Sequence, residues 1–221
     1  IEDDIRAVVP LKPALIMPTK VAGAEDIHAV SAMILAAERE NGLPEGSVGL
    51  IPLLETALGI ENAYQIATAD PRVKAIFLGA EDLSSDLQAI RSKENHEILY
   101  ARGRVVMAAR AAGVDCYDTP FTDVNDDEGL AQDAAFARAI GFTGKAVISP
   151  RHVPAVNEAF SPSDKDIAYA REVMAVIEEG ERMGRGAVSL RGKMIDKPIV
   201  DRARRVLEAA EALGLGGYEH E

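Results

Sequence analysis

Short apolar runs alternate with longer stretches of helical periodicity through the first two thirds of the chain. The apolar runs are rich in Val, Ile, Leu and Phe and show no polar alternation, which is typical of parallel strands covered on both faces. They predict five strands, at residues 14–17, 48–54, 74–78, 114–117 and 145–148. The stretches between them predict helices at 24–41, 59–68, 96–112 and 127–140. This repetition predicts a parallel sheet with right-handed crossover connections.

The pattern changes after Ser149, where strand-like runs give way to helical ones. A short helix is predicted at 150–160, and Ser163 is a suitable cap for a long helix that runs to about Arg185. A last helix is predicted at 198–213, with Pro198 in its first turn. Glycines at 184, 186 and 192 mark a connection between these two helices. We therefore divide the chain into residues 1–160, which carry the sheet, and a helical extension, 161–221.

Two architectures fit five strand–helix units. A closed barrel of eight units usually needs about 250 residues, and this chain has 221. The units form either an open, doubly wound five-stranded sheet or a barrel whose first three strands lie before Ile1. No Gly-x-Gly-x-x-Gly turn follows any strand, so the dinucleotide-binding version of the open sheet has no support. Composition alone does not choose between the two.

The charge of the chain narrows the classes of partner. It has 24 Lys and Arg against 36 Asp and Glu, a net charge of −12, whereas nucleic acids and anionic membranes bind basic surfaces. No apolar run approaches the ~20 residues that span a bilayer, and no signal-peptide pattern opens the chain. The single Cys116 excludes an internal disulfide and suits a reducing compartment. We expect a cytoplasmic protein that binds neither nucleic acid nor membrane.

Two acidic residues follow neighbouring predicted strands. Glu55 comes directly after the apolar run 50–54, and Asp82 follows the run 75–79 after two intervening residues. The carboxyl ends of parallel strands open onto one face of a sheet, where ligands bind. Carboxylate oxygens are the ligands that Mg²⁺ prefers. The pair therefore predicts a magnesium site; the alternative is that Glu55 caps the following helix and Asp82 caps a loop.

Four sequence motifs favour the barrel. They are LIPLLETALGIENA (50–63), KAIFLGAEDLSSDL (74–87), GFTGKAVISPRHVPAVNEAF (141–160) and RGKMIDKPIV (191–200). In this order and spacing, the chain from Pro13 to about Ala210 resembles the HpcH/HpaI aldolase and citrate lyase superfamily. The resemblance is strongest to the citrate lyase β-subunit-like branch, which is similar to the malyl-CoA and citramalyl-CoA lyases.

The resemblance implies a fold and an activity. The fold is a TIM (β/α)8 barrel with a C-terminal helical lid, about three of whose N-terminal strands are absent from this chain. The activity is Mg²⁺-dependent carbon–carbon bond cleavage or formation in a β-hydroxy acyl thioester such as citryl-, malyl- or citramalyl-CoA, which gives an α-keto acid and an acetyl thioester. Glu55 and Asp82 are then the metal ligands. The alternative is a non-catalytic β-like subunit or scaffold, because the arginine with which relatives bind the keto acid has no counterpart here.

The resemblance also assigns Asp196. The matching aspartate of the lyase branch lies on the lid, enters the site of a neighbouring subunit and serves there as general acid or base. This role implies a homo-oligomer, a trimer or hexamer. The plain alternative is a helix cap, since Asp196 stands two residues before Pro198.

Two further residues are candidate substrate contacts. Lys20 lies just past the first strand, although Thr19 interrupts the Pro-Lys pair of the family, and a solvated loop lysine is the alternative. Asp118 follows the fourth strand at the end that faces the site. Glu81 and Asp86 flank the metal motif, and we interpret them as surface acids in preference to groups that support the ligands.

Overall fold

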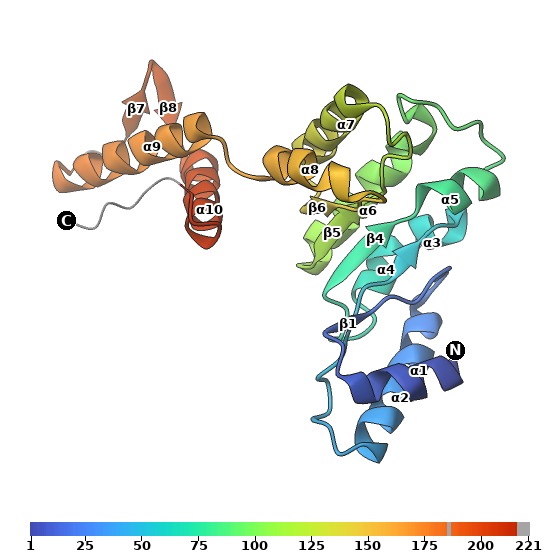
Figure 1. The fold of residues 1–221 in the computed structure, drawn as a ribbon. Coiled ribbons are helices and arrows are strands. Elements are labelled where there is room, and N and C mark those ends of the chain that lie inside the picture. Colours follow the sequence, from blue (N-terminus) through green and yellow to red (C-terminus); the bar gives the residue numbers. More distant parts are fainter. Residues whose placement is uncertain (185–186, 216–221) are drawn as a thin grey trace. The chain divides into compact units, whose positions relative to one another are not determined.

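The computed structural model describes residues 1–184 and 187–215. The chain forms two compact units, unit 1 (Ile1–Ala159) and unit 2 (Phe160–Glu221). Figure 1 shows the helices and strands of each. The predicted boundary at 160/161 lies one residue from this division, and the roles predicted for the two parts stay predictions.

Strands and helices alternate along unit 1. In chain order the elements up to its end are α1 (Glu2–Val8), the 3₁₀-helix η1 (Val9–Leu11), β1 (Leu15–Ile16), α2 (Ala24–Glu40), β2 (Gly49–Leu50), β3 (Leu53–Leu54), α3 (Ala57–Glu61), α4 (Ala63–Ala67), β4 (Ala75–Leu78), α5 (Ala80–Asp86), the 3₁₀-helix η2 (His96–Ile98), α6 (Leu99–Ala112), β5 (Asp115–Asp118), α7 (Asp127–Ile140), β6 (Gly144–Lys145), the 3₁₀-helix η3 (Pro150–His152) and α8 (Val153–Phe160).

The predicted elements of unit 1 are present. Each predicted strand overlaps an observed strand, although the run 145–148 shares only Lys145 with β6. The run 48–54 contains two strands, because Pro52 between them has no N–H for the ladder. The helix predicted at 59–68 is divided into α3 and α4. The helix at 127–140 has its predicted bounds. The helices α6 and α7 end at Gly113 and Gly141, whose φ angles of 73° and 114° are left-handed, a conformation that glycine adopts readily at helix ends. The short helices α1 and α5 were not predicted.

The strands of unit 1 pair in the order in which they occur along the chain. β1 pairs with β2, and β3, β4, β5 and β6 pair in sequence, all in parallel. A bridge between Leu50 and Val73 links β2 to the segment that enters β4. This confirms an α/β fold with a parallel sheet. The order has no point of reversal, which a doubly wound sheet requires, and the strands of the described residues do not close into an eight-stranded barrel.

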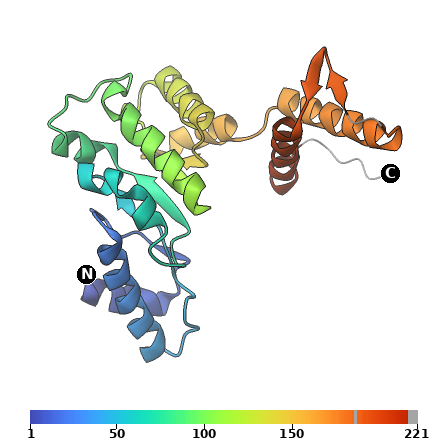
Figure 2. The ribbon, with the colours of Figure 1, turned by 180° about the vertical axis from the view of Figure 1, so that it is seen from behind.

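The two faces of the sheet differ in burial. On one face, Ile76 and Leu78 of β4 are fully buried, and α6 packs against β4 and β5, as Figure 2 shows from behind. On the other face, the register aligns Phe77 with Leu53 and Tyr117, and all three are only half-buried. The prediction that both faces are covered therefore holds for the face under α6, whereas these side chains of the other face are only partly covered.

Unit 2 is a helical pair with a hairpin. Its elements are α9 (Asp164–Arg182), β7 (Val188–Leu190), β8 (Lys193–Ile195) and α10 (Lys197–Ala212), which share a core of Ala170, Val173, Ile195, Val200 and Ala203. Ser163 caps α9 as predicted: its Oγ accepts the N–H of Asp166 at 3.2 Å, and the Asp166 carboxylate accepts the N–H of Ser163 at 3.1 Å. α9 ends three residues before the predicted Arg185, which lies outside the described residues.

The antiparallel hairpin β7–β8 lies where the sequence predicted only a connection. Arg191 and Gly192 form its turn with φ angles of 52° and 77°, the left-handed values of the tight turns that hairpins favour. Arg-Gly is a weaker turn signal than Asn-Gly, which explains why the hairpin was missed. Of the other two glycines that were predicted to mark this connection, Gly184 precedes the hairpin and Gly186 lies outside the described residues.

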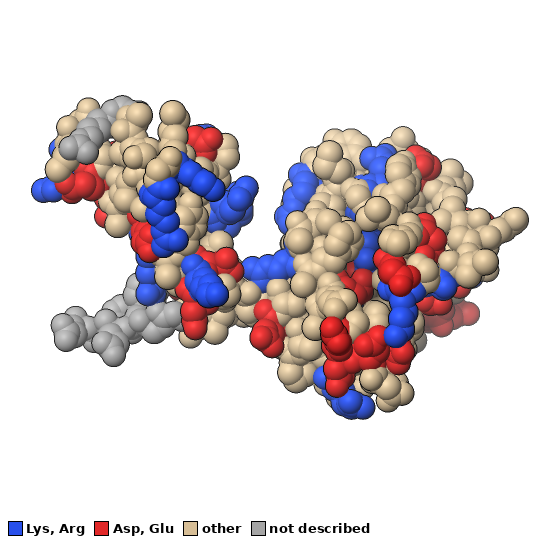
Figure 3. Space-filling model, turned by 90° about the horizontal axis from the view of Figure 1, so that it is seen from above, with Lys and Arg blue, Asp and Glu red and all other residues tan. Residues whose placement is uncertain are grey.

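The surface of unit 1 reflects the acidic composition. Figure 3 shows Asp and Glu side chains gathered on part of one face of this unit, with Lys and Arg side chains nearby. Across the described ranges of the chain, no helix combines the length and the apolar character that crossing a membrane requires.

Candidate functional site

Glu55 lies between β3 and α3, at the carboxyl end of its strand. Its side chain is only 7% exposed, and its Oε1 accepts the backbone N–H of Lys20 at 2.9 Å. The neighbouring Thr56 caps α3, because its Oγ1 accepts the N–H of Gly59 at 3.1 Å. The alternative interpretation, in which Glu55 is a helix cap, is therefore wrong.

Gly79, at the end of β4, leaves the space that Glu55 occupies. A Cβ at position 79 would lie 2.8 Å from the Cβ of Glu55 and 3.1 Å from its Oε2. The first contact is closer than Cβ atoms tolerate, and the second would require the carboxylate to move by a few tenths of an ångström. A residue without a side chain at the end of one strand thus allows the carboxylate of the next strand to turn toward α5.

Asp82 lies in the first turn of α5 and does not cap a loop or a helix. Its side chain is 55% exposed, and its Oδ2 lies 3.7 Å from Nζ of Lys20. Burial raises the pKa of Glu55; the carboxylate of Asp82 raises it further, and the N–H and charge of Lys20 oppose both effects. Glu55 and Asp82 are therefore close enough for their charges to interact.

Lys20 contacts both acids. Its backbone N–H binds Glu55 and its ammonium group faces Asp82, while its φ of 53° places the residue in the left-handed region. The side chain is 68% exposed, so water screens much of its charge. Its predicted role as a substrate contact stays a prediction.

The donors at this corner suit magnesium. In the described part of the chain, no three His, Cys, Asp or Glu side chains are grouped so that they could hold a metal ion. Two carboxylates are nevertheless a common protein contribution to Mg²⁺, which keeps several waters and binds substrate oxygens in its remaining positions. A divalent cation would also offset the repulsion that helps to raise the pKa of Glu55. The residues present therefore fit the ion.

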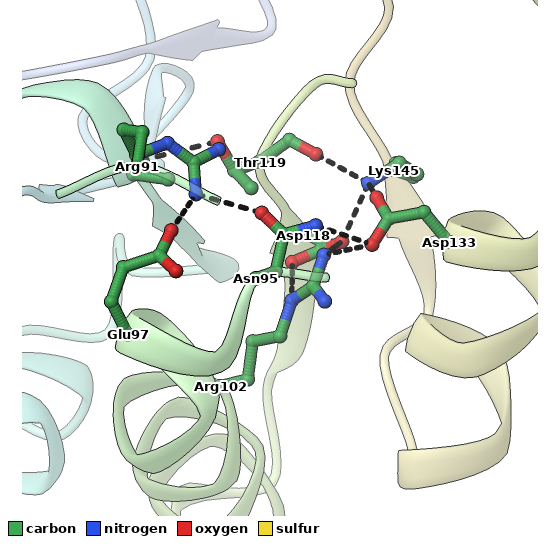
Figure 4. Close-up of polar contacts among 9 residues, drawn as sticks. Arg91, Asn95, Glu97, Arg102, Asp118, Thr119, Asp133 and Lys145 are labelled. Carbon is green, nitrogen blue, oxygen red and sulfur yellow. Dashed lines mark hydrogen bonds and ion pairs between the residues drawn. The ribbon is translucent and has the colours of Figure 1, made fainter. Parts of the chain in front are cut away.

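Asp118, the last residue of β5, lies in a buried cluster of ion pairs (Figure 4). Its Oδ1 accepts Nε of Arg102 at 3.0 Å, and its Oδ2 accepts Arg102 at 2.8 Å and Nζ of Lys145 at 2.7 Å. Asp118 is fully buried on the face of the sheet that α6 covers. Its predicted role in substrate binding stays a prediction, and both of its oxygens are already bonded within the chain.

Asp133 of α7 completes this cluster. Its oxygens accept Arg102 at 2.7 Å, Lys145 at 2.5 Å and the side-chain amide of Asn95 at 2.9 Å. Burial acts to raise the pKa of Asp133, but Lys145 and Arg102 together outweigh it and lower the pKa. Two carboxylates and two cations thus balance one another inside the protein.

Asp196 is the N-cap of α10. Its Oδ1 accepts the N–H of Ile199 at 3.2 Å, with Pro198 in the first turn of the helix. The capping interpretation is therefore confirmed. The side chain is exposed in unit 2, and its predicted role as general acid or base stays a prediction.

Several residues of these clusters had no signal in the sequence. Arg102 and Asp133 lie within helices, where charged residues usually form the solvated face, and neither belongs to a motif. Gly79 was read only as the end of an apolar run. A stronger signal exists for Asp86, which lies one helical turn after Asp82 in the same motif.

A cleft of about 600 Å³ opens beside the buried cluster. Phe121, Phe136, Lys93 and Arg102 contribute to its walls. Neither Glu55 nor Asp82 lines it, so the cleft and the candidate metal site are separate features of unit 1.

Comparison with known proteins decides the family. The family model described as HpcH/HpaI aldolase/citrate lyase matches residues 1–150. The chain belongs to this family. Citrate lyase subunit beta of Leuconostoc mesenteroides subsp. cremoris is 40% identical over 211 residues, which cover 96% of this chain and 70% of that protein. The mitochondrial citramalyl-CoA lyase of Mus musculus is 34% identical over 209 residues, which cover 91% of this chain and 62% of that protein.

Solved structures agree with this assignment. A citrate lyase from Burkholderia xenovorans LB400 superposes with a TM-score of 0.86 at 26% identity, covering 99% of this chain and 71% of the other. CitE from Mycobacterium tuberculosis, in complex with magnesium, acetoacetate and coenzyme A, gives a TM-score of 0.74 at 30% identity, covering 95% and 73%. The first of these structures is named a citrate lyase, and the second contains magnesium.

Proposed function

We propose that the protein is a Mg²⁺-dependent carbon–carbon lyase. It cleaves or forms a β-hydroxy acyl thioester such as citryl-, malyl- or citramalyl-CoA, with an α-keto acid and an acetyl thioester as the other reactants. The observation that carries the proposal is the convergence of Glu55 and Asp82 on Lys20 at the ends of neighbouring strands. Relatives named as lyases, and a related structure with magnesium and coenzyme A, support it.

In this proposal Glu55 and Asp82 hold the ion through their carboxylate oxygens. Bound Mg²⁺ would supply Lewis-acid stabilisation of the charge that develops when the carbon–carbon bond breaks. The Lys20 N–H fixes Oε1 of Glu55, which leaves the second oxygen of this buried carboxylate for the ion. Asp82 is more exposed and faces the solvent side, where a substrate enters.

The remaining candidate residues have proposed roles in the same reaction. The ammonium group of Lys20 is exposed and offers positive charge to a substrate carboxylate. Asp118 holds the carboxyl end of β5 in place through Arg102 and Lys145, and a direct substrate contact requires it to exchange one of these partners. Asp196 moves a proton at the acetyl carbon in the site of a neighbouring subunit, in a homo-oligomer (trimer or hexamer).

Metal binding and turnover test the proposal together. Titration calorimetry with MgCl₂ measures binding, and coupled assays measure release of pyruvate, glyoxylate or oxaloacetate from the corresponding thioesters. Glu55→Gln and Asp82→Asn should each weaken Mg²⁺ binding by at least about tenfold and abolish turnover, because each removes an anionic ligand. Glu81→Gln is the matched control, since Glu81 is adjacent on α5 but pairs with Arg91. Wild-type binding and turnover in either ligand variant would refute the proposal.

A second candidate is a non-catalytic β-like subunit or scaffold of a larger lyase assembly. The name of the most similar relative described above, a citrate lyase subunit, favours it. This candidate predicts no Mg²⁺-dependent turnover by the chain alone and a stable complex with a second polypeptide in size-exclusion chromatography. The single, buried Cys116 is compatible with the reducing, cytoplasmic location that either candidate assumes.

A further inference from the structure

The helix α5, which is labelled beside α3 in Figure 1, carries two acids near the segment that contains Glu55. Asp82 and Asp86 are four residues apart, so they lie on the same side of the helix. Asp82 is close enough to Glu55 to influence its charge. Asp86 accepts the backbone N–H of Ala57 at 2.7 Å, two residues after Glu55 in the chain. Asp86 thus bonds to the segment that carries Glu55, and Lys20 links Asp82 to the carboxylate of Glu55.

The bond from Asp86 has a clear local cause. Ala57 is the first residue of α3, and the first N–H groups of a helix have no partner within it. Thr56 satisfies a later one through Gly59, and the carboxylate of Asp86 satisfies that of Ala57. A negative charge at a helix N-terminus is also favoured by the peptide dipoles. The contact is therefore directional, and it fixes the end of α5 on the start of α3.

The other end of α5 is fixed as well. The N–H of Ala80, its first residue, donates to Oγ1 of Thr119 at 3.2 Å. The carbonyl of Thr119 accepts Nζ of Lys145 at 2.7 Å, which connects it to the buried ion cluster. Asp82 lies between the two attachment points. The helix that carries one candidate ligand is thus held against a rigid part of the sheet and against the segment that carries the other ligand.

We propose that Asp86 is a positioning residue of the metal site: its bond to the N–H of Ala57 sets the separation of Glu55 and Asp82 and thereby the affinity for Mg²⁺. The inference rests on the proposed function, since it takes these two residues as the ligands. Mg²⁺ requires near-ideal geometry at short bond lengths, so its affinity depends on how closely the two carboxylates are held together before it binds. Asp86 does not itself contact the ion.

The test compares three substitutions at position 86 by Mg²⁺ titration calorimetry and thermal denaturation. Asp86→Ala removes the acceptor and should raise the dissociation constant for Mg²⁺ by about tenfold or more. Asp86→Asn keeps an acceptor oxygen in the same place and should restore binding to within about threefold of wild type, although it removes a charge. Asp86→Glu keeps the charge but lengthens the side chain, and it should bind more weakly than Asp86→Asn. Glu81→Gln is the control for loss of a nearby charge on α5.

The possible outcomes distinguish the position of the oxygen acceptor at residue 86 from the charge of the side chain and from the stability of the protein. Equal weakening in Asp86→Ala and Asp86→Asn would show that only the charge matters and would overturn the inference. Wild-type affinity in Asp86→Ala would also overturn it. If Asp86→Ala melts at a much lower temperature, the test uses Asp86→Glu, which keeps a carboxylate near the start of α3. Weaker Mg²⁺ binding than in Asp86→Asn then supports the inference, and wild-type affinity overturns it. Failure of the proposed function is distinct, because Glu55→Gln would then leave Mg²⁺ binding unchanged.

Discussion

Unit 1 contains two pairs of carboxylates that differ in how their charge is balanced. Asp118 and Asp133 are buried, and Arg102 and Lys145 each bond to both of them. In the described part of the chain, the ion pair found at Glu55 and Asp82 is that of Asp82 with the exposed ammonium group of Lys20. The pKa of Asp133 is lowered, whereas the pKa of Glu55 is raised. The pKa shifts of Asp133, which lies in α7, and of Glu55, which follows β3, thus have opposite directions.

The difference shows what separates a structural acid from one that can serve a ligand. A buried carboxylate with two fixed cations has no charge left to attract an ion, and its value lies in geometry and folding. A carboxylate whose surroundings raise its pKa is not neutralised by cations of the protein, so a bound cation would stabilise its ionised form. Shifted pKa values of this kind are common at functional sites. Position at a strand end alone did not distinguish Asp118 from Glu55.

The largest effect is expected from unbalancing the buried cluster. Lys145→Met leaves two buried carboxylates with only Arg102, so the free energy of unfolding should fall by roughly 3–5 kcal/mol. Urea denaturation followed by circular dichroism measures the change. Lys20→Met is the matched control, because an exposed ion pair contributes about 1 kcal/mol or less. Equal losses in both variants would contradict the comparison.

Glu38 of α2 is, like Asp118 and Asp133, a buried acid whose charge is balanced by a neighbouring cation. It is fully buried, accepts Arg72 at 2.9 and 2.6 Å, and also accepts the N–H groups of Gly46 and Val48. The hydrogen bonds from Arg72, assisted by these N–H groups and opposed by burial, lower the pKa of Glu38 from 4.5 to about 2. Because the folded pKa is depressed, the stability that Glu38 contributes is present above pH 4.5 and is lost as the pH falls through about 2.

This contribution is roughly 3 kcal/mol at neutral pH. Glu38→Gln should lower the free energy of unfolding by that amount at pH 7. The difference between variant and wild type should shrink as the pH falls from 4.5 toward 2. Denaturation curves at several pH values in this window measure it, and a difference that does not change with pH would contradict the assigned state of Glu38.

Mg²⁺ should stabilise the protein by binding to Glu55 and Asp82, the pair of acids that has no buried cation as partner among the residues that the structure describes. At a free concentration about 100 times its dissociation constant, a ligand that binds only the folded state adds about 2.7 kcal/mol. Thermal denaturation with and without MgCl₂ measures this gain, with NaCl of equal ionic strength as the control. The gain should vanish in Glu55→Gln and persist in Lys145→Arg if that variant folds; persistence in Glu55→Gln would place the ion elsewhere.

The smallest effect distinguishes Glu55 from Glu38 without metal. The folded pKa of Glu55 is raised, so its carboxyl group favours folding below its unfolded pKa, and this contribution is lost as the pH rises through the folded value. In metal-free buffer at pH 7, Glu55→Gln should therefore be as stable as wild type or more stable, by less than about 1 kcal/mol. A clear loss of stability at pH 7 would show that Glu55 is a structural acid.

The sequence predicted the fold better than it predicted the site. Apolar runs and helical periodicity located the strands and the bounds of α7, since these signals are local. The positions of Glu55 and Asp82 after neighbouring strands predicted that the two candidate ligands lie close together, and both interact with Lys20. The partners of Asp118 could not be predicted, because both depend on tertiary contact: Lys145 meets it through the pairing of β5 with β6, and Arg102 through the packing of α6 against the sheet. Asp86 was interpreted as a surface acid, and its exposure agrees, but its bond to Ala57 depends on tertiary contact.

Gly79 has a consequence for ion selectivity. A methyl group at position 79 would lie 2.8 Å from the Cβ of Glu55, so it would push this side chain and its carboxylate outward. Mg²⁺ accepts oxygen atoms only near 2.0–2.1 Å, whereas Ca²⁺ tolerates 2.3–2.6 Å and irregular arrangements. Gly79→Ala should thus shift the preference of this corner from the smaller cation to the larger one. The absence of a side chain at Gly79 would then make the site select its cation by size.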